Sequence, residues 1–419
     1  MICLVEALYY KCLQYIKKDI ESFHLLVGPN ASGKSTFLDV VSFLGDSVRE
    51  GPEVAVHKRT PNYSDLIWQR KDTPFELAIE LVIPERFKSV FGRSGNCRYE
   101  VSLGKVNDGG EFGIISETVW FKPSIAMDKL RLQYLAKQQD LFPSPLKPPM
   151  RITTSGRRTN WKKIVNKVKG GNDNFYAETK GFDHAFKLGP QKSALGNLPE
   201  DENKFPISTW LKRTLMQGIQ TIVLNSEVMR KPSPPGMPRY FRTDGSNLPW
   251  VVEQLYKEHT DKFNDWIEHL RTALPDLRSI KTILREEDKH CYIILKYATG
   301  LEVPSWMISD GTLRMLALTI LAYLPNMEGT LLIEEPENGI HPKAIETVFQ
   351  SLSSVYGAQI LIATHSPVML SIARINDILC FAKTDDGAVD IISGSYHPDL
   401  KEWKGETPLD VLFASGVLG

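Results

Sequence analysis

The sequence GPNASGKST at positions 28–36 has the residue types and spacing of a phosphate-binding loop. It fits the pattern G-x-x-x-x-G-K-[ST], in which backbone N–H groups and the N-terminus of the next helix surround an anion. Lys34 would supply positive charge to the β- and γ-phosphates, and Ser35 would offer a hydroxyl to Mg²⁺. The residues expected to contact the bound nucleotide here are Gly28, Asn30, Gly33, Lys34, Ser35 and Thr36. The sequence therefore predicts a nucleoside triphosphate site.

Two adjacent carboxylates end an apolar run in TLLIEEPENGIHP, residues 330–342. Neighbouring side chains of a strand point to opposite sides, so Glu334 and Glu335 cannot have the same role. We assign Glu334 to the metal side and Glu335 to orienting and polarising the attacking water. A solvated, charged strand end is the alternative, and the phosphate-binding loop makes it less favoured.

Two further elements could bind anions. The run Ser309-Asp310-Gly311-Thr312 precedes a predicted helix, where a hydroxyl and glycine amides could contact phosphate, although Ser309 alone could be a helix cap. His365 follows the apolar run QILIAT and could hydrogen-bond a γ-phosphate, although a lone histidine is usually structural. We expect Ser309 and Gly311 to bind the nucleotide and His365 to act with Glu335 in catalysis.

The elements that must position these residues follow from hydrophobic periodicity. FHLLV before the loop and FLDVVSFL after it predict a strand and a helix. Alternating residues at 75–83, 98–106 and 115–121 predict antiparallel strands, and strands alternate with helices after about residue 279. An apolar stripe from Val252 to Leu274 predicts one long helix.

Composition excludes several classes of protein. Apolar residues are 42% and charged residues 24% of the 419 residues, so a disordered or collagen-like chain is not expected. Lys plus Arg and Asp plus Glu are 50 each, so overall charge does not favour nucleic acid or membranes. The five cysteines form no C-x-x-C pair, and no apolar run approaches 20 residues. We expect a cytoplasmic protein without membrane contact.

The segment 141–172 differs from the rest of the chain. It has no acidic residue, while eight Lys and Arg side chains lie between Lys147 and Lys169 beside four prolines. This composition predicts a mobile basic insert. Nucleic-acid contact, contact with a partner protein and simple solvation all remain open for it.

Together, the phosphate-binding loop, SDGTLRMLAL, LLIEEPENGIHP and ATHSP resemble an ATP-binding-cassette-type ATPase. They are most similar to the soluble branch with structural-maintenance-of-chromosomes (SMC), RecF-type and overcoming-lysogenization-defect proteins, and within it to the AAA-21 ATPases that often lie beside phage-defence genes. This resemblance implies an α/β head with a mixed, mainly parallel sheet and an antiparallel β-subdomain. We expect the head at residues 1–125 and 279–419, and an inserted, largely helical lobe at 126–278.

The resemblance also implies ATP and Mg²⁺ as ligands and a head-to-tail homodimer or higher oligomer, in which Ser309 and Gly311 complete the other subunit's site. Asn338 and Gly339 occupy the family's D-loop position at that interface. The chain departs from most cassette proteins at Glu334, where aspartate is usual, and at Asp310 and Thr312 of the signature. These departures argue against a transporter subunit.

Our leading hypothesis is an ATP-hydrolysing switch that controls a separate effector protein, such as a nuclease, in bacterial phage defence. The alternatives are a RecF- or SMC-like DNA clamp and a scaffold that binds ATP without hydrolysing it. A closed AAA+ ring is not expected. Two assignments stay open: the magnesium-sensing glutamine could be Gln69 or Gln191, and Asp244–Leu248 could form either a turn or part of the site.

Overall fold

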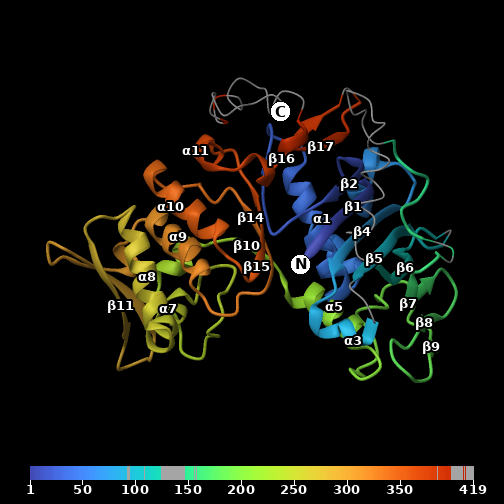
Figure 1. Ribbon diagram of the computed structural model, residues 1–419, viewed down its shortest axis with the longest axis horizontal. Coiled ribbons are helices and arrows are strands. Elements are labelled where there is room, and N and C mark those ends of the chain that lie inside the picture. The colour runs from blue at the N-terminus through green and yellow to red at the C-terminus, as the bar shows by residue number, and fades with distance from the viewer. Residues whose placement is uncertain are drawn as a thin grey trace.

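The computed structural model describes residues 1–91, 95–107, 109–123, 147–154, 156, 158–384, 386–397, 409 and 411. Its strands form three sheets, and helices lie between and beside them (Figure 1). The helices are α1 (Lys34–Glu50), α2 (Pro52–His57), α3 (Lys88–Phe91), α5 (Pro206–Gln217), α6 (Ser226–Arg230), α7 (Leu248–Glu258), α8 (Thr260–Arg271), α9 (Asp310–Thr319), α10 (Pro342–Ser353) and α11 (Pro367–Ile372).

The central sheet contains the strand that leads into the phosphate-binding loop. In spatial order its strands are β10 (Ile219–Ile222), β14 (Gly329–Glu334), β15 (Ala358–Ala363), β3 (Phe23–Val27), β16 (Ile378–Lys383) and β17 (Val389–Ser393). Only the pairing of β16 with β17 is antiparallel. The carboxyl ends of the first five strands therefore lie at one edge, where α/β proteins place their ligands.

An antiparallel sheet of eight strands packs beside the central sheet. Its spatial order is β2 (Leu13–Asp19), β1 (Ile2–Tyr10), β4 (Phe75–Val82), β5 (Gly95–Lys105), β6 (Phe112–Pro123), β7 (Lys162–Val168), β8 (Asp173–Phe175) and β9 (His184–Phe186). The predicted strands at 75–83, 98–106 and 115–121 correspond to β4, β5 and β6. The third sheet, β11 (Leu277–Leu284), β12 (Cys291–Tyr297) and β13 (Glu302–Pro304), lies with α7 and α8 at the opposite end of the molecule (Figure 1).

Helix α1 lies between the two large sheets, and its apolar residues join both to one core. Successive residues of each central strand point to opposite faces of the sheet, so the sheet separates this core from a second one. Leu26 and Leu361 face α1, whereas Leu25 and Ile360 face the core beneath α7 to α10. Both faces of the sheet are thus covered, as expected for parallel strands with continuous apolar sequences.

Two local predictions differ from the structure. The stripe from Val252 to Leu274 does not form one helix, because the backbone breaks at His259, which has φ −140°. This break brings the Tyr256 and Phe263 rings to 5.1 Å. Residues seven apart in a straight helix are about 10 Å apart along its axis, so these two rings meet because the chain bends between them.

The basic segment also differs from the loop that we predicted. Residues 162–168 form strand β7, which pairs with β6, and Lys167 is buried in an ion pair of 2.8 Å with Asp173. Arg157 and residues 141–146 lie outside the described residues. The division of the chain at residues 125 and 278 stays a prediction. Elements between these positions contribute to both large sheets, since β7 to β9 extend the antiparallel sheet and β10 joins the central sheet.

No helix among the described residues is both long enough and apolar enough to cross a membrane.

Candidate functional site

The phosphate-binding loop connects β3 to α1 at the carboxyl edge of the central sheet. Gly28 and Gly33 have φ values of 149° and 100°, which suit glycine, and a Cβ at either position would meet Phe381 or Val389 within 2.7 Å. Helix α1 begins without a side-chain cap and without an acidic residue in its first turn. Its first N–H groups therefore remain available for an anion.

Lys34 folds back over its own loop. Its Nζ donates to the carbonyl oxygens of Gly28 at 2.9 Å and Pro29 at 2.8 Å. Burial lowers the pKa of Lys34, while Glu335 and Glu334 oppose that shift. Both carboxylates are thus close enough to affect this ammonium group, as the predicted triphosphate site requires.

Ser35 and Glu334 meet across 299 positions of sequence. The Ser35 hydroxyl donates to Glu334 Oε2, and both side chains are exposed at the edge of the sheet. No cluster of three or more metal-binding His, Cys, Asp or Glu side chains occurs in the part of the chain that the structure describes. Mg²⁺ is usually bound by one or two protein oxygens together with phosphates and water. Ser35 and Glu334 therefore fit Mg²⁺ that enters with a nucleotide.

Glu335 follows β14 with an unusual backbone conformation. Its φ is 45°, and its N–H donates to Ala363 O at 2.8 Å. The Asn338 side-chain amide donates to Glu335 Oε2 at 2.5 Å, and the Asn338 N–H donates to Glu335 O at 3.0 Å. A left-handed backbone at a residue other than glycine is a form of strain found at functional sites. The adjacent carboxylates thus have different surroundings, as their sequence positions predicted.

His365 follows the neighbouring strand β15 and is half-buried. Burial and the Lys34 ammonium lower the pKa of His365, whereas Glu335 and Glu337 oppose this shift. The imidazole is therefore neutral at pH 7 and lies in the same electrostatic environment as the phosphate-binding loop.

Glu337 is a part of this edge to which we assigned no role from the sequence. Its Oε1 accepts hydrogen bonds from the Thr364 hydroxyl at 2.6 Å and from the His365 N–H at 3.0 Å. Glu337 thus connects the loop after β14 to the loop after β15. The sequence offered one indication of this role, the place of Glu337 in the run EEPENG, but its hydrogen-bond partners lie 27 and 28 residues later in the chain.

Ser309 is the exposed N-cap of α9, so the capping alternative is present in the structure. Its hydroxyl oxygen accepts from the Thr312 N–H at 3.2 Å. A Cβ at Gly311 would lie 2.2 Å from Gly339 O, so these two backbones are in close contact. We use the name signature loop for residues 308–311. Because Gly311 packs against Gly339, the signature loop lies directly beside the segment of Asn338 and Gly339.

The structure also places the two candidates for the magnesium-sensing glutamine, Gln191 and Gln69. Gln191 donates to Phe112 O at 2.5 Å, and its carbonyl lies against Gly51, beyond the far end of α1. Seventeen helical residues, about 25 Å, separate that position from the phosphate-binding loop. Gln69 follows Ile67, which forms a backbone bridge to Tyr10 near the turn between β1 and β2. The structure thus removes Gln191 as the magnesium-sensing residue.

The segment Asp244–Leu248 is a turn that leads into α7. Asp244 Oδ1 accepts from the Ser246 N–H at 3.0 Å and from its hydroxyl at 2.7 Å. Asn247 is the N-cap residue of α7, and its side-chain amide donates to two backbone oxygens of the preceding loop. The turn alternative therefore accounts for this sequence.

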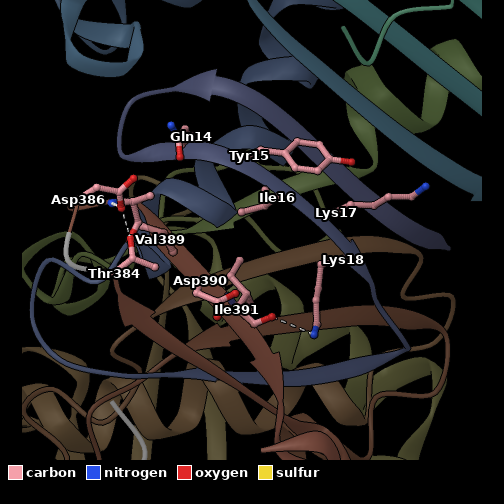
Figure 2. Close-up of a pocket in the computed structure, with 11 residues that line it drawn as sticks. Gln14, Tyr15, Ile16, Lys17, Lys18, Thr384, Asp386, Val389, Asp390 and Ile391 are labelled. Carbon is pink, nitrogen blue, oxygen red and sulfur yellow. Dashed lines mark hydrogen bonds between the residues drawn. The ribbon is translucent and has the colours of Figure 1, made fainter. Parts of the chain in front are cut away.

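A cavity of about 160 Å³ lies beside the phosphate-binding loop, between β2 and the hairpin of β16 and β17 (Figure 2). Val389 lines this cavity and also packs against Gly33. Cys12 lies on the same side of the loop, with its Sγ 3.3 Å from the Thr36 hydroxyl. Val389 and Cys12 therefore pack against the side of the phosphate-binding loop that faces away from β14.

Comparisons with known proteins identify the family and the fold. The AAA_21 family, described as "AAA domain, putative AbiEii toxin, Type IV TA system", matches residues 148–371, which is more than half of the chain. An SMC head bound to the C-winged helix domain of ScpA is 14% identical, with a TM-score of 0.51, over 93% of this chain and 97% of that chain.

Two further SMC heads are similar over most of their length. The Pyrococcus furiosus head with an extended coiled coil, bound to the C-terminal domain of ScpA, is 13% identical, with a TM-score of 0.46, over 93% of this chain and 95% of that one. The Thermotoga maritima head is 10% identical, with a TM-score of 0.42, over 94% and 98%. The chain belongs to the AAA_21 family of P-loop ATPases, and it has the ABC-ATPase-type fold of an SMC head.

Proposed function

We propose that this protein hydrolyses ATP between two head-to-tail subunits and uses the cycle as a molecular switch. The observation that carries the proposal is the single sheet edge where the phosphate-binding loop, the Glu334–Ser35 contact, Glu335 and His365 meet. Phosphoryl transfer depends mostly on positioning and charge stabilisation, and this edge supplies both.

Each residue has a distinct role in this proposal. Lys34 and the N–H groups of the loop bind the β- and γ-phosphates, and Ser35 and Glu334 hold Mg²⁺, which neutralises phosphate charge when it is bound. Glu335 orients and polarises the attacking water, with its carboxylate fixed by Asn338. Neutral His365 hydrogen-bonds the γ-phosphate without competing with Lys34 for its charge.

Measurement of phosphate release tests the assignment of Glu335. Glu335→Gln keeps the size and shape of the side chain but removes its charge, so we expect turnover to fall by about 10²-fold or more. Glu346→Gln is a matched control, because Glu346 is exposed on α10 and accepts a hydrogen bond from Gln350 of the same helix. Equal rates for Glu335→Gln and the wild type would refute the role of Glu335.

The position of the signature loop supports the proposed dimer. Ser309 is exposed at the start of α9, and Gly311 contacts Gly339 of the segment after the catalytic carboxylate. A two-fold dimer uses the same two surfaces twice. We expect a mixture of Lys34→Ala and Ser309→Ala subunits to regain activity, because one site of each mixed dimer would be intact. A mixture that pairs but stays inactive would contradict the dimer.

We further propose that the switch controls a separate effector protein in phage defence. The family description names a type IV toxin–antitoxin system, and one SMC head of similar fold is bound to a domain of ScpA. Purification from the native host in the presence of ATP, with Glu335→Gln to prolong the bound state, should retain the effector. Recovery of the dimer without any associated protein would count against this role.

A DNA clamp is the second candidate, and the exposed basic residues around β7 favour it. Lys147, Arg151, Arg158 and Lys169 are exposed, whereas Lys167 is paired internally. Mobility shifts on single-stranded and duplex DNA, with ATP and across salt concentrations, test this candidate. Binding that weakens with added salt would support the clamp.

A further inference from the structure

Arg230 anchors both sides of the exposed Ser309. Its Nη2 forms an ion pair of 2.6 Å with Asp310 Oδ1, and its Nε and Nη2 both donate to Ile308 O at 3.2 Å. The backbone oxygen of Arg230 accepts from the hydroxyl of buried Ser305 at 2.9 Å. One residue outside the signature loop therefore fixes the residues immediately before and after Ser309.

The geometry of these contacts suits a guanidinium group. A planar guanidinium can donate to a carbonyl and a carboxylate at the same time, whereas a lysine ammonium acts as a single compact charge. The side chains of Arg230 and Asp310 are 34% and 56% exposed, so their pairing contributes little to stability. Substitutions at this pair should therefore change the position of the loop more than the folding of the chain.

Arg230 also lies at the end of a path from the nucleotide edge. It is the last residue of α6, and α6 begins four residues after β10 ends beside Ile333 of β14. At the start of α6, the Ser226 hydroxyl accepts from Arg314 Nε at 3.4 Å, and Arg314 Nη1 donates to Asn338 O at 3.3 Å. Asn338 in turn contacts Glu335, so α6 contacts the signature loop directly through Arg230 and is linked to the segment after Glu335 through Arg314 of α9.

We infer that Arg230 is a positioning residue, which acts with Asp310 to present Ser309 to the triphosphate bound by the other subunit. This inference rests on the proposed ATP-dependent dimer. It gives Asp310 a role at a position where most cassette proteins have a different residue. Arg230 itself does not touch the nucleotide, and it acts on a site whose phosphate-binding loop belongs to the partner.

Mixing experiments separate action on the partner's site from action within one subunit. Arg230→Ala alone should lower kcat by about 10- to 100-fold, because a displacement of about 1 Å has effects of this size. The KM for ATP should stay near the wild-type value, since each phosphate-binding loop is intact. Arg230→Lys should not restore the rate. Arg213→Ala is the matched control, because Arg213 lies on α5 and forms an exposed ion pair with Glu202.

In a mixture of Lys34→Ala and Arg230→Ala, each mixed dimer has one site with an intact phosphate-binding loop and an intact signature loop. We expect turnover above that of either parent. The mixture of Lys34→Ala and Ser309→Ala is the reference. If the reference recovers and the Arg230→Ala mixture does not, Arg230 acts within its own site and the inference is wrong. If the reference itself fails despite pairing, the proposed dimer is wrong, and the inference fails with it.

Discussion

Substitution of Gly311 by alanine tests whether the contact between the signature loop and the D-loop segment controls catalysis. The Cβ of alanine would lie 2.2 Å from Gly339 O, whereas ordinary contact begins near 3.4 Å. One of the two backbones must therefore move by about 1.2 Å, the difference between these distances. Gly339 should move, because its own Cβ position faces open space while α9 is held by buried Leu313.

Two opposing contributions determine the change in stability. Forcing a methyl group into a packed contact costs about 1–3 kcal/mol, and replacing a helical glycine with alanine returns about 0.5–1 kcal/mol. We expect the free energy of unfolding to fall by about 1–2 kcal/mol. The protein should remain folded, so an effect on activity can be measured separately.

The effect on catalysis should be larger. Movement of Gly339 displaces Asn338, whose amide holds the Glu335 carboxylate at 2.5 Å. A displacement of about 1 Å in a catalytic site can reduce turnover by about 10²-fold. Steady-state phosphate release measures kcat, and urea unfolding measures stability. Gly109→Ala is the control, since its Cβ would make only ordinary contacts. Wild-type kcat in Gly311→Ala would refute the proposed coupling.

Three further predictions concern the loop, the histidine and helix α1. Gly33→Ala should abolish nucleotide binding in a fluorescent-nucleotide titration, because its backbone φ is 100° and its Cβ would lie 2.7 Å from Val389. Burial lowers the pKa of His365, so the acid limb of kcat/KM that this group causes should lie below pH 6.5 and disappear in His365→Asn. Burial alone would raise the pKa of the Asp39 carboxyl, yet the Arg59 guanidinium beside it holds this pKa below its ordinary value of 3.8. Asp39→Asn should therefore cost about 3 kcal/mol in urea unfolding at pH 7, a difference that shrinks as pH falls below about 4.

The local sequence predicted the parts of the site that depend on short-range spacing. The strand β3, the glycine loop and α1 follow from one continuous motif, and β14 with its two carboxylates follows from another. Glu337 shows why the rest was missed. Its role depends on Thr364 and His365, which become neighbours only through the parallel pairing of β14 and β15.

The errors in the fold have the same origin. Lys167 appeared to belong to a solvated basic loop, but Asp173 lies six residues later and neutralises it inside the sheet. The predicted stripe from Val252 to Leu274 is divided between two helices by a bend at His259, and its member Tyr256 is exposed while Leu255 beside it is buried. A periodic pattern predicts the buried face of a continuous helix, and a break in the backbone changes that face.

The backbone strain at Glu335 explains how a side chain on an exposed loop can be held precisely. A left-handed φ of 45° at glutamate costs on the order of 1 kcal/mol or more, so this conformation must be maintained by its surroundings. The hydrogen bond from its N–H to Ala363 O fixes it to β15, and both hydrogen bonds from Asn338 close the turn. Glu337 then fixes that turn to Thr364 and His365. The carboxylate and the imidazole are therefore positioned by one connected backbone unit, so a change that loosens Glu337 should displace both groups together.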